Sequence, residues 1–418
     1  MSAKPSIMPL PARESASDTW LQSAGRIALL KQLRQLKHGE VVIVEGRTRH
    51  RFGARTATCA LSTTIEVKHP QFWADASFGG SVGAGESYIY GHWSCDQLVA
   101  LIRIMVMNRE LLDTMEGGLA IVTAPLRRIL HWMNRNSKDG SKRNIAAHYD
   151  LGNDFFELFL DDTMAYSCGI FEREDATLKE ASLAKFDAAC RKLALKPTDH
   201  LVEIGTGWGG LAIHAARNYG CRVTTTTISR EQYEMAKRRV AEAGLNDRID
   251  LRLDDYRDLQ GRYDKLVSVE MIEAVGHQFL GGYLAKCSSL LKPHGAAVIQ
   301  AITIQDQIYE AALKSVDFIQ RFIFPGSFIP SVTAITSALT SHTDMKVFHM
   351  EDIGPHYATT LRMWREAFFA NIEKVRALGY SEDFIRLWDY YLCYCEGGFA
   401  ERQLGDVQLT LVKQGFRG

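Results

Sequence analysis

One stretch decides the fold: Leu201-Val202-Glu203-Ile204-Gly205-Thr206-Gly207-Trp208-Gly209-Gly210, a short apolar run that ends in a cluster of glycines. The residues that follow, 211–217, are mostly apolar with a helical pattern, so the segment predicts a buried strand, a tight turn and a helix start. Glycines in such a turn permit positive φ and let a ligand lie directly against the backbone. In open α/β sheets, nucleotide-like ligands bind at this place, the carboxyl end of a parallel strand. A glycine-rich turn can also be purely structural, so the rest of the chain must decide.

Alternating strand and helix patterns continue beyond this turn. A threonine-rich run at 221–228 predicts a second strand, and Ser229 with Gln232 predicts a capping box at the start of a helix. Further strands are expected at 249–253, 265–269 and 296–304, with helices at 231–243 and 279–290. Strands separated by helices of this size are typical of a parallel, doubly wound α/β sheet.

The 418 residues are enough for two or three domains. We predict a flexible tail at 1–18, a small mixed amino-terminal domain at 19–120, a basic connector at 121–143 and a catalytic domain at 144–418. Within the small domain, short strands are expected at 40–46 and 57–67.

The charge pattern excludes some classes of protein and leaves one question open. Lys plus Arg equals Asp plus Glu at 49 each, which argues against a nucleic-acid-binding protein. Residues 1–60 nevertheless carry ten basic against four acidic side chains, and 127–143 is a second basic cluster. These are either solvated helix faces or surfaces attracted to anionic lipid headgroups.

No apolar run reaches the roughly 20 residues that span a bilayer. The eight cysteines have no paired spacing, no secretory signal pattern is present, and no Cys/His set predicts a metal site. A cytoplasmic protein with free thiols, peripheral at the inner membrane surface, is the expectation.

The strand ends narrow the choice of ligand. The turn reads G-x-G-x-G-G rather than G-x-G-x-x-G, and the second strand does not end in the acid that a dinucleotide ribose requires. No triphosphate-binding G-x-x-x-x-G-K-[ST] occurs. Asp254 and Asp255 follow the third strand and could accept from an adenine amino group. A nucleoside without phosphates fits best, and S-adenosylmethionine is the obvious candidate.

Several uncommon motifs, in order, resemble those of cyclopropane-fatty-acyl-phospholipid synthases across about residues 144–415. They are Tyr166-Ser167-Cys168-Gly169, Glu203–Gly210, Thr227–Gln232, Asp255-Tyr256-Arg257, Ser268–Gly276, Phe322–Gly326, Ile329–Ser331 and Trp388–Phe399. The resemblance implies a Rossmann-like class I methyltransferase domain. It also implies transfer of a methylene from S-adenosylmethionine to the cis double bond of an acyl chain in a phospholipid.

The resemblance also implies a set of donor-binding residues, which lie in several of these motifs. They are Tyr166, Ser167, Glu203, Gly205, Thr206, Gly207, Gly209, Thr227, Ser229, Gln232, Asp254, Asp255 and Tyr256.

The chemistry needs no activated nucleophile, because an alkene attacks the sulfonium methyl without losing a proton first. It does need orientation, aromatic faces near the resulting cation and a base that removes a proton from the new methyl. In the family that base is a bound bicarbonate. Its holders correspond here to Cys168 and Ile302, by their backbones, and to Glu273, Gln300 and Tyr357.

Two positions depart from the family pattern. Gln300 stands where His is common, and an amide cannot carry charge or titrate. Thr206 replaces a common Cys, which should matter little because the turn presents mainly backbone. Gln300 keeps a second product open, a methyl-branched, methylene-branched or unsaturated chain, and a non-catalytic lipid-binding protein is a third alternative. The expected partners are a cis-unsaturated phospholipid, the membrane surface and a second copy in a homodimer.

Overall fold

The computed structural model describes residues 20–112 and 151–417, which divide into two compact units. The small unit comprises residues up to 112 together with 314–323 and 372–403. The large unit comprises 151–313, 324–371 and 404–417. The tail expected at 1–18 and the connector expected at 121–143 lie outside the described residues.

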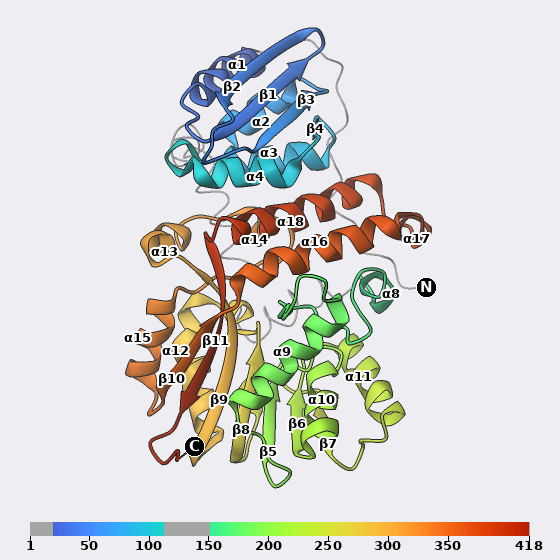
Figure 1. Cartoon of the computed structure of the whole chain (residues 1–418), viewed down its shortest axis with the longest axis vertical. Helices are drawn as coiled ribbons and strands as arrows, with labels where there is room; N and C mark the ends of the chain where they lie inside the picture. Colours follow the sequence, from blue (N-terminus) through green and yellow to red (C-terminus); the bar gives the residue numbers. More distant parts are fainter. Residues whose placement is uncertain (1–19, 113–150, 418) are drawn as a thin grey trace. The chain divides into compact units, whose positions relative to one another are not determined.

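The large unit contains a seven-stranded sheet in the order β10-β11-β9-β8-β5-β6-β7 (Figure 1). Neighbouring strands from β9 to β7 run parallel, whereas β11 is antiparallel to both β9 and β10. The strands are β5 His200–Ile204, β6 Arg222–Thr226, β7 Ile249–Arg252, β8 Tyr263–Val269, β9 Leu291–Ile304, β10 Lys346–Asp352 and β11 Leu404–Val412. The doubly wound α/β sheet expected from the sequence is confirmed.

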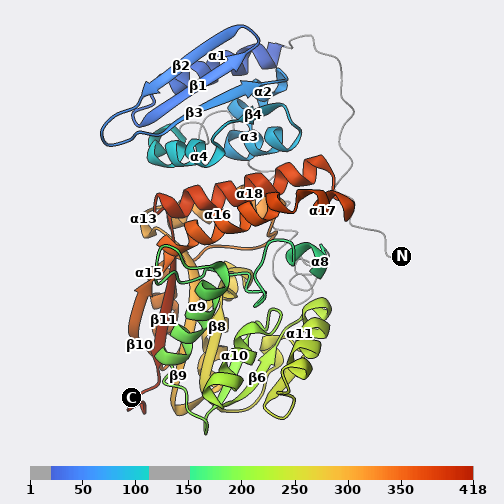
Figure 2. The ribbon, with the colours of Figure 1, turned by 45° about the vertical axis from the view of Figure 1, so that its right-hand side comes forward.

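Helices cover both faces of this sheet (Figure 2). Successive strand residues point to opposite faces, so Leu201 packs with α9 and α10 in one apolar core and Val202 packs with α12 and α15 in the other. The helices of the unit are α8 Asn153–Phe156, α9 Leu178–Lys192, α10 Gly210–Tyr219, α11 Arg230–Glu242, α12 Leu280–Ser289, α13 Asp306–Ala312, α15 Val332–His342 and α16 Gly354–Ala370. Short 3-10 turns occupy Tyr256–Asp258, Ile272–Ala274 and His277–Phe279.

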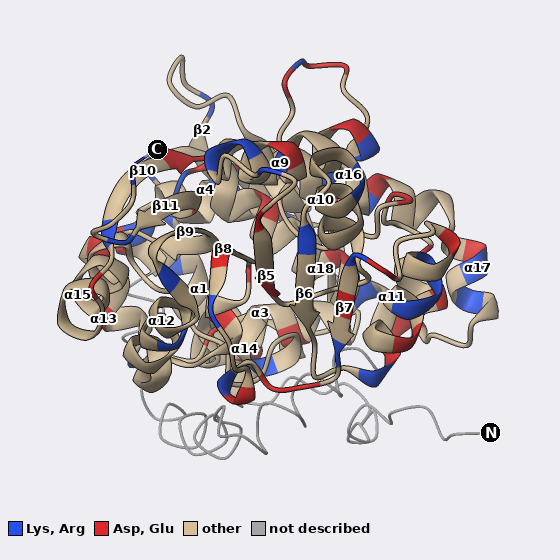
Figure 3. Cartoon of the chain, turned by 90° about the horizontal axis from the view of Figure 1, so that it is seen from below, with Lys and Arg blue, Asp and Glu red and all other residues tan. Residues whose placement is uncertain are grey.

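Helix α11 illustrates the division between core and solvent. Its buried residues include Met235, Ala236 and Val240, whereas acidic and basic residues, most of them exposed, are interspersed along the helix (Figure 3). Of the two hydrogen bonds of the capping box expected here, one is present, so the prediction of the second was wrong. The Ser229 hydroxyl accepts from the Gln232 N–H at 3.3 Å, but the Gln232 side chain accepts from the Thr227 hydroxyl at 2.9 Å instead of returning to Ser229.

The small unit is built on a four-stranded mixed sheet in the order β2-β1-β3-β4. Its strands are β1 Gly39–Glu45, β2 Thr48–Ala54, β3 Ser62–Val67 and β4 Trp93–Cys95. The sequence analysis missed β2 and β4, which are short or strongly basic. Its helices are α1 Trp20–Leu33, α2 Gln71–Phe78, α3 Gly80–Ile89, α4 Leu98–Met107, α14 Phe318–Phe322, α17 Ile372–Ala377 and α18 Glu382–Ala400.

Two segments from late in the chain complete the core of the small unit, although the sequence analysis assigned them to the catalytic domain. Helix α18 packs against α3 and α4, and the Tyr88 hydroxyl donates to Asp389 at 2.7 Å. A Cβ on Gly85 would lie 2.6 Å from the ring of Phe318, so only glycine permits this contact with α14. Periodicity could not reveal this arrangement, because it depends on which distant segments meet. The domain boundaries expected at residues 120 and 144 stay a prediction.

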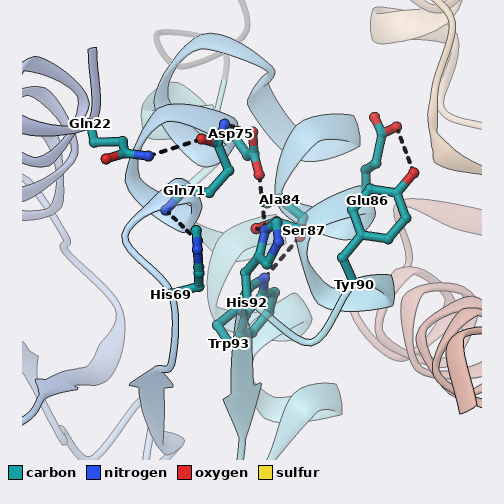
Figure 4. Close-up of polar contacts among 10 residues, drawn as sticks. All are labelled: Gln22, His69, Gln71, Asp75, Ala84, Glu86, Ser87, Tyr90, His92 and Trp93. Carbon is teal, nitrogen blue, oxygen red and sulfur yellow. Dashed lines mark hydrogen bonds and ion pairs between the residues drawn. The ribbon is translucent and has the colours of Figure 1, made fainter. Parts of the chain in front are cut away.

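A polar network ties α1 and α2 to the strand-flanking turns of the small unit (Figure 4). The Gln22 amide donates to Gln71, which donates to Asp75 at 2.7 Å. The other Asp75 oxygen faces His92 Nδ1 at 3.4 Å, and Ser87 is 3.2 Å from the same nitrogen. Each charged group of this network therefore has a partner.

Candidate active site

The glycine turn after β5 follows the geometry expected for a ligand-binding turn. Gly205, Gly207 and Gly209 all have positive φ, at 98°, 51° and 87°. A Cβ on Gly205 would lie 2.4 Å from Cγ of Met271, whereas a Cβ on Gly207 would meet nothing within 4 Å. The turn is thus closed against the protein at Gly205 and open at Gly207. A turn of this kind ahead of a helix is suited to bind polar ligand atoms.

Hydrogen bonds join the carboxyl ends of β5, β6 and β7 into one edge. The N–H groups of Gly205 and Thr206 both donate to the Thr226 carbonyl, at 3.1 and 3.0 Å. The Thr226 hydroxyl donates in turn to the Asp254 carbonyl at 2.5 Å. Residues far apart in sequence therefore lie on a continuous surface.

Beneath this edge, Glu203 is a buried acid. It accepts from the Thr225 hydroxyl at 2.5 Å, and that hydroxyl also bonds the Thr206 hydroxyl at 2.7 Å. Burial raises the pKa of the Glu203 carboxyl to about 8, so the group is mainly protonated at neutral pH. A neutral carboxyl can donate as well as accept, which suits the recognition of hydroxyl groups.

The two acids after β7 have different roles in the structure. Asp255 is buried and accepts two hydrogen bonds from the Arg257 guanidinium, at 2.8 and 2.6 Å. Asp254 is exposed. Tyr256, which follows Asp255, packs its ring edge-on against Tyr283, with centroids 5.2 Å apart. Asp254 is accordingly the acid available to a ligand, and Asp255 shapes the turn.

Aromatic rings line the region around Tyr166. Its ring lies 5.3 Å from Phe156 and 5.1 Å from Trp364, between centroids. Phe156 also contacts Trp208 of the glycine turn at 5.0 Å, and Trp364 contacts Tyr357 at 6.1 Å. The rings of Phe156, Tyr166, Trp208, Tyr357 and Trp364 form an aromatic wall. This wall extends from the glycine turn after β5 to a cluster of acidic side chains around Glu270. Such rings stabilise a neighbouring cation through their negative faces.

Three hydrogen-bond donors converge on the carboxylate of Glu270, which follows β8. The Cys168 N–H and the Gln300 amide both donate to Oε1, each at 2.8 Å. The Tyr357 hydroxyl donates to Oε2 at 2.6 Å. Glu270 keeps part of its surface accessible, whereas Cys168, Gln300 and Tyr357 are buried. We call these three donors the donor cradle.

A second carboxyl, Asp406 on β11, lies on the other side of Gln300. The Gln300 amide donates to its Oδ2 at 2.9 Å, and Gln408 donates to the Gln300 carbonyl oxygen at 3.0 Å. Burial and the charge of Glu270 raise the pKa of the Asp406 carboxyl well above its ordinary value. These effects favour the protonated form of Asp406, and its hydrogen bond with Glu270 favours the ionised form of Glu270. Burial also raises the pKa of Glu270, but Tyr357, Lys185 and the Cys168 N–H oppose that rise.

Glu273, one helical turn after Glu270, is the third carboxyl. It accepts from the Ile302 N–H at 2.5 Å, and no described residue hydrogen-bonds its Oε2. Burial and the nearby charge of Glu270 raise its pKa to about 8. Of the three carboxyls, Glu270 accepts the most hydrogen bonds, and three donors on its two oxygens favour its ionised form.

The nearest buried cation is Lys185 on α9. Its ammonium donates to the Ser167 hydroxyl at 2.5 Å, and burial lowers its pKa while Glu270 opposes that effect. The neighbouring Cys168 thiol is buried and lies 3.2 Å from the Gly169 carbonyl, and burial raises its pKa well above the ordinary value. A protonated thiol is a poor nucleophile, in agreement with the chemistry expected.

The residues expected to hold bicarbonate do come together, but their donors are already used. Cys168, Gln300 and Tyr357 donate to Glu270, and Ile302 donates to Glu273. A second anion would have to displace the Glu270 carboxylate or lie beside its charge in a buried place. Bicarbonate therefore does not fit this arrangement.

Glu270 was predicted only as a member of the Ser268–Gly276 motif. Asp406, Lys185 and Gln408 were not predicted as site residues. Glu270 had a detectable signal, because it places a second acid three residues before Glu273 in one motif. Asp406 and Gln408 lie on a strand whose pairing with β9 only the tertiary structure reveals.

Comparisons with known proteins agree with this arrangement. A family model described as "Mycolic acid cyclopropane synthetase" matches residues 136–409. The chain is 40% identical over 344 residues to the tuberculostearic acid methyltransferase UfaA1 of Mycobacterium tuberculosis (strain H37Rv), covering 80% of each chain. It is 37% identical over 351 residues to the cyclopropane-fatty-acyl-phospholipid synthase of Escherichia coli (strain K12), covering 83% of this chain and 86% of that one. A solved structure, mycolic acid cyclopropane synthase CmaA1 complexed with SAH and CTAB, matches with 32% identity and a TM-score of 0.61, covering 65% and 98% of the two chains.

Proposed function

This chain belongs to the mycolic acid cyclopropane synthetase family, and from that premise we propose that it converts the cis double bond of a phospholipid acyl chain into a cyclopropane. It is an S-adenosylmethionine-dependent methyltransferase with the class I fold. The finer proposal concerns the acceptor and the product. The double bond attacks the methyl carbon of the donor, the carbon–sulfur bond breaks, and a carbocation forms on the chain.

One observation carries this proposal: a carboxyl group whose two oxygens accept three hydrogen bonds lies beside an aromatic wall that extends to the glycine turn. Tyr166 and Trp364 supply faces that stabilise a cation, and Glu270 supplies a proton acceptor. The protonated thiol of Cys168 supports a path without a covalent enzyme intermediate. The thirteen donor-binding residues expected from the sequence are proposed for that role because the structured edge of β5, β6 and β7 contains most of them.

A second product is supported by a specific observation. Gln300 is neutral where a titratable side chain is common in the family, and one relative is a tuberculostearic acid methyltransferase. In this alternative, a hydride shift moves the cation onto the methylated carbon. Loss of a proton from the methyl then leaves a methylene branch. Cyclopropane and methylene products have the same mass but different proton NMR signals.

The membrane surface is the proposed source of the lipid. On α1, Trp20 is 77% exposed and Ile27 is 70% exposed, and the exposed Lys31 and Arg34 follow them. A helix that presents an apolar pair with basic neighbours is suited to anionic lipid headgroups. Across residues 20–112 and 151–417, no helix is both long and apolar enough to cross a bilayer. We propose that the protein is cytoplasmic and binds the membrane surface peripherally, which vesicle flotation tests. We also propose that it forms a homodimer, which sedimentation tests.

The test uses vesicles that contain a cis-monounsaturated phospholipid, incubated with the full chain and S-adenosylmethionine carrying a labelled methyl. Mass spectrometry reports the gain of one CH2, and NMR distinguishes ring protons from methylene protons. Ring protons are expected. Methylene protons would move the assignment to the second product. Unchanged lipid with retained donor binding would establish the non-catalytic alternative and overturn the proposal.

Flotation tests the lipid surface separately. Trp20→Ser with Ile27→Ser is expected to weaken binding to anionic vesicles several-fold. Phe348→Ser removes an exposed apolar side chain of the large unit, 62% exposed, and serves as the matched control that should not change flotation.

A further inference from the structure

The Glu270 carboxylate occupies an anion-binding site made by the protein itself. Its two oxygens receive three hydrogen bonds, from a backbone N–H, an amide and a phenol, at 2.6–2.8 Å. Hydrogen bonds to an ionised acceptor are stronger than those between neutral groups. Cys168 and Gln300 are completely buried, so these donors are directed inward to one acceptor and not to bulk solvent.

The backbone at Glu270 is held in a conformation that side chains seldom adopt. Its φ is 49°, in the left-handed region that favours glycine, and its N–H donates to the Gln300 carbonyl at 2.9 Å. Such a conformation is unfavourable for a residue with a Cβ. Glycine would avoid that cost. The carboxylate is thus held in the donor cradle at an energetic expense that a purely structural turn would not need.

The surrounding groups allow one negative charge and disfavour two. Burial favours the protonated forms of Asp406 and Glu273, and Lys185 is the buried cation whose field reaches Glu270. An added bicarbonate would face the Glu270 charge in a region of low polarity, where like charges repel strongly. The cradle would also have no donor left for it.

We propose that Glu270 is a catalytic residue, the built-in base that removes the proton during ring closure, in the position where a bound bicarbonate would otherwise act. This inference rests on the proposed alkylation of a cis double bond.

The step balances in atoms and electrons. The carbocation produced by methyl transfer loses one proton from the new methyl group to a Glu270 oxygen. The electron pair of that C–H bond forms the second carbon–carbon bond of the ring. S-adenosylhomocysteine is the other product, and the proton then leaves Glu270 for solvent. No oxidant, reductant or further co-reactant is needed.

Bicarbonate dependence tests the proposal directly. In buffer freed of carbon dioxide, the wild-type chain is expected to turn over at the rate seen with added bicarbonate. Stimulation of tenfold or more by bicarbonate would overturn the proposal. A wild type that is inactive under both conditions would instead refute the proposed function, so the two failures are distinguishable.

Two variants of Glu270 separate an empty cradle from a filled one. Glu270→Gln keeps the size of the side chain but removes the base, so turnover should fall at least 100-fold with S-adenosylhomocysteine affinity unchanged by calorimetry. Glu270→Gly removes the side chain and suits the positive φ, so its melting temperature should be equal to or above that of wild type.

Chemical rescue completes the test. Added bicarbonate or formate should restore turnover of Glu270→Gly in a concentration-dependent way, and ¹³C-bicarbonate should show line broadening with this variant but not with wild type. Glu270→Gln is the matched control, which neither anion should rescue because its amide still fills the cradle. Turnover of Glu270→Gln within threefold of wild type, or absence of both rescue and broadening in Glu270→Gly, would overturn the proposal.

Discussion

Acidic side chains in the two units of this chain illustrate two kinds of surroundings. In the small unit the half-buried Asp75 and Glu401 and the buried Asp389 each have a polar partner: Asp75 faces His92, Asp389 accepts from Tyr88, and Glu401 forms an ion pair with Arg103 at 2.6 Å. In the large unit, Glu270, Glu273 and Asp406 crowd together, and the nearest buried ammonium donates to a serine. Paired charges are sufficient for stability. A crowded set with one retained charge is a costly arrangement, and costly arrangements are typical of reactive sites.

The largest effect that tests this contrast should come from Tyr357→Phe. It removes the hydroxyl that donates to Glu270 at 2.6 Å, which raises the pKa of that carboxyl and misorients it. We expect turnover to fall about 10- to 100-fold, because the base is still present and the whole contribution of a general base is typically about 100- to 10,000-fold, with donor affinity unchanged by calorimetry.

Tyr88→Phe is the matched control, because it removes a hydroxyl–carboxylate bond of 2.7 Å from the small unit. It should lower the free energy of unfolding by about 1–2 kcal/mol without changing kcat. Equal losses of turnover in both variants would contradict the contrast.

Lys185→Met should shift the pH dependence of turnover. The Lys185 charge lowers the pKa of Glu270, so its removal raises that pKa and moves the acidic limb of the pH–rate profile to higher pH. A shift of about one pH unit corresponds to roughly 1.4 kcal/mol of lost interaction. Arg103→Met, in the small unit, should leave the profile unmoved, and an unshifted profile for Lys185→Met would show that the cation does not act on the base.

Stability should depend on pH in opposite directions in the two units. The Glu273 carboxyl has a pKa of about 8 against an ordinary 4.5, so between these values the folded state binds more protons and stability falls as pH rises. Burial alone would raise the pKa of Asp96 in the small unit, but hydrogen bonds from Thr64 and Thr63 lower it overall. Its contribution is present above pH 3.8 and is lost as the pH falls further.

Urea unfolding between pH 3 and 9 would measure both effects. Glu273→Gln should reduce the fall in stability between pH 4.5 and 8, by up to about 1 kcal/mol per pH unit. It should not change the loss of stability below pH 3.8. Asp96→Asn should do the reverse. If the fall in stability between pH 4.5 and 8 is the same in Glu273→Gln as in wild type, another group causes it.

The smallest effect is expected from Arg103→Ala. The ion pair with Glu401 is partly exposed, with 37% and 17% of the two side chains accessible, so solvent screens it. The loss in unfolding free energy should be below about 1 kcal/mol and should shrink in high salt. A change in turnover would show that the paired charges of the small unit contribute to catalysis.

The amino-acid sequence was sufficient to predict the parallel strands β5 to β9 and the glycine turn after β5, but not β10 and β11. Glycines at 205, 207 and 209 and the threonines of β6 carry local conformational and hydrogen-bonding preferences, so their placement follows from short-range rules. The donor-binding role of the residues in these motifs stays a prediction. The same local rules predicted strands β5 to β9 within a few residues.

The contacts of the Glu270 cluster and the segments that form the small unit became visible only in the tertiary structure. Glu270 meets Cys168, Gln300 and Tyr357 from separate elements, and Asp406 reaches Gln300 through the pairing of β11 with β9. Whether a carboxyl is charged depends on burial and on all its neighbours at once, and no single motif contains that information. For the same reason, the packing of α18 against α3 and α4 is a property of distant contacts and not of local pattern.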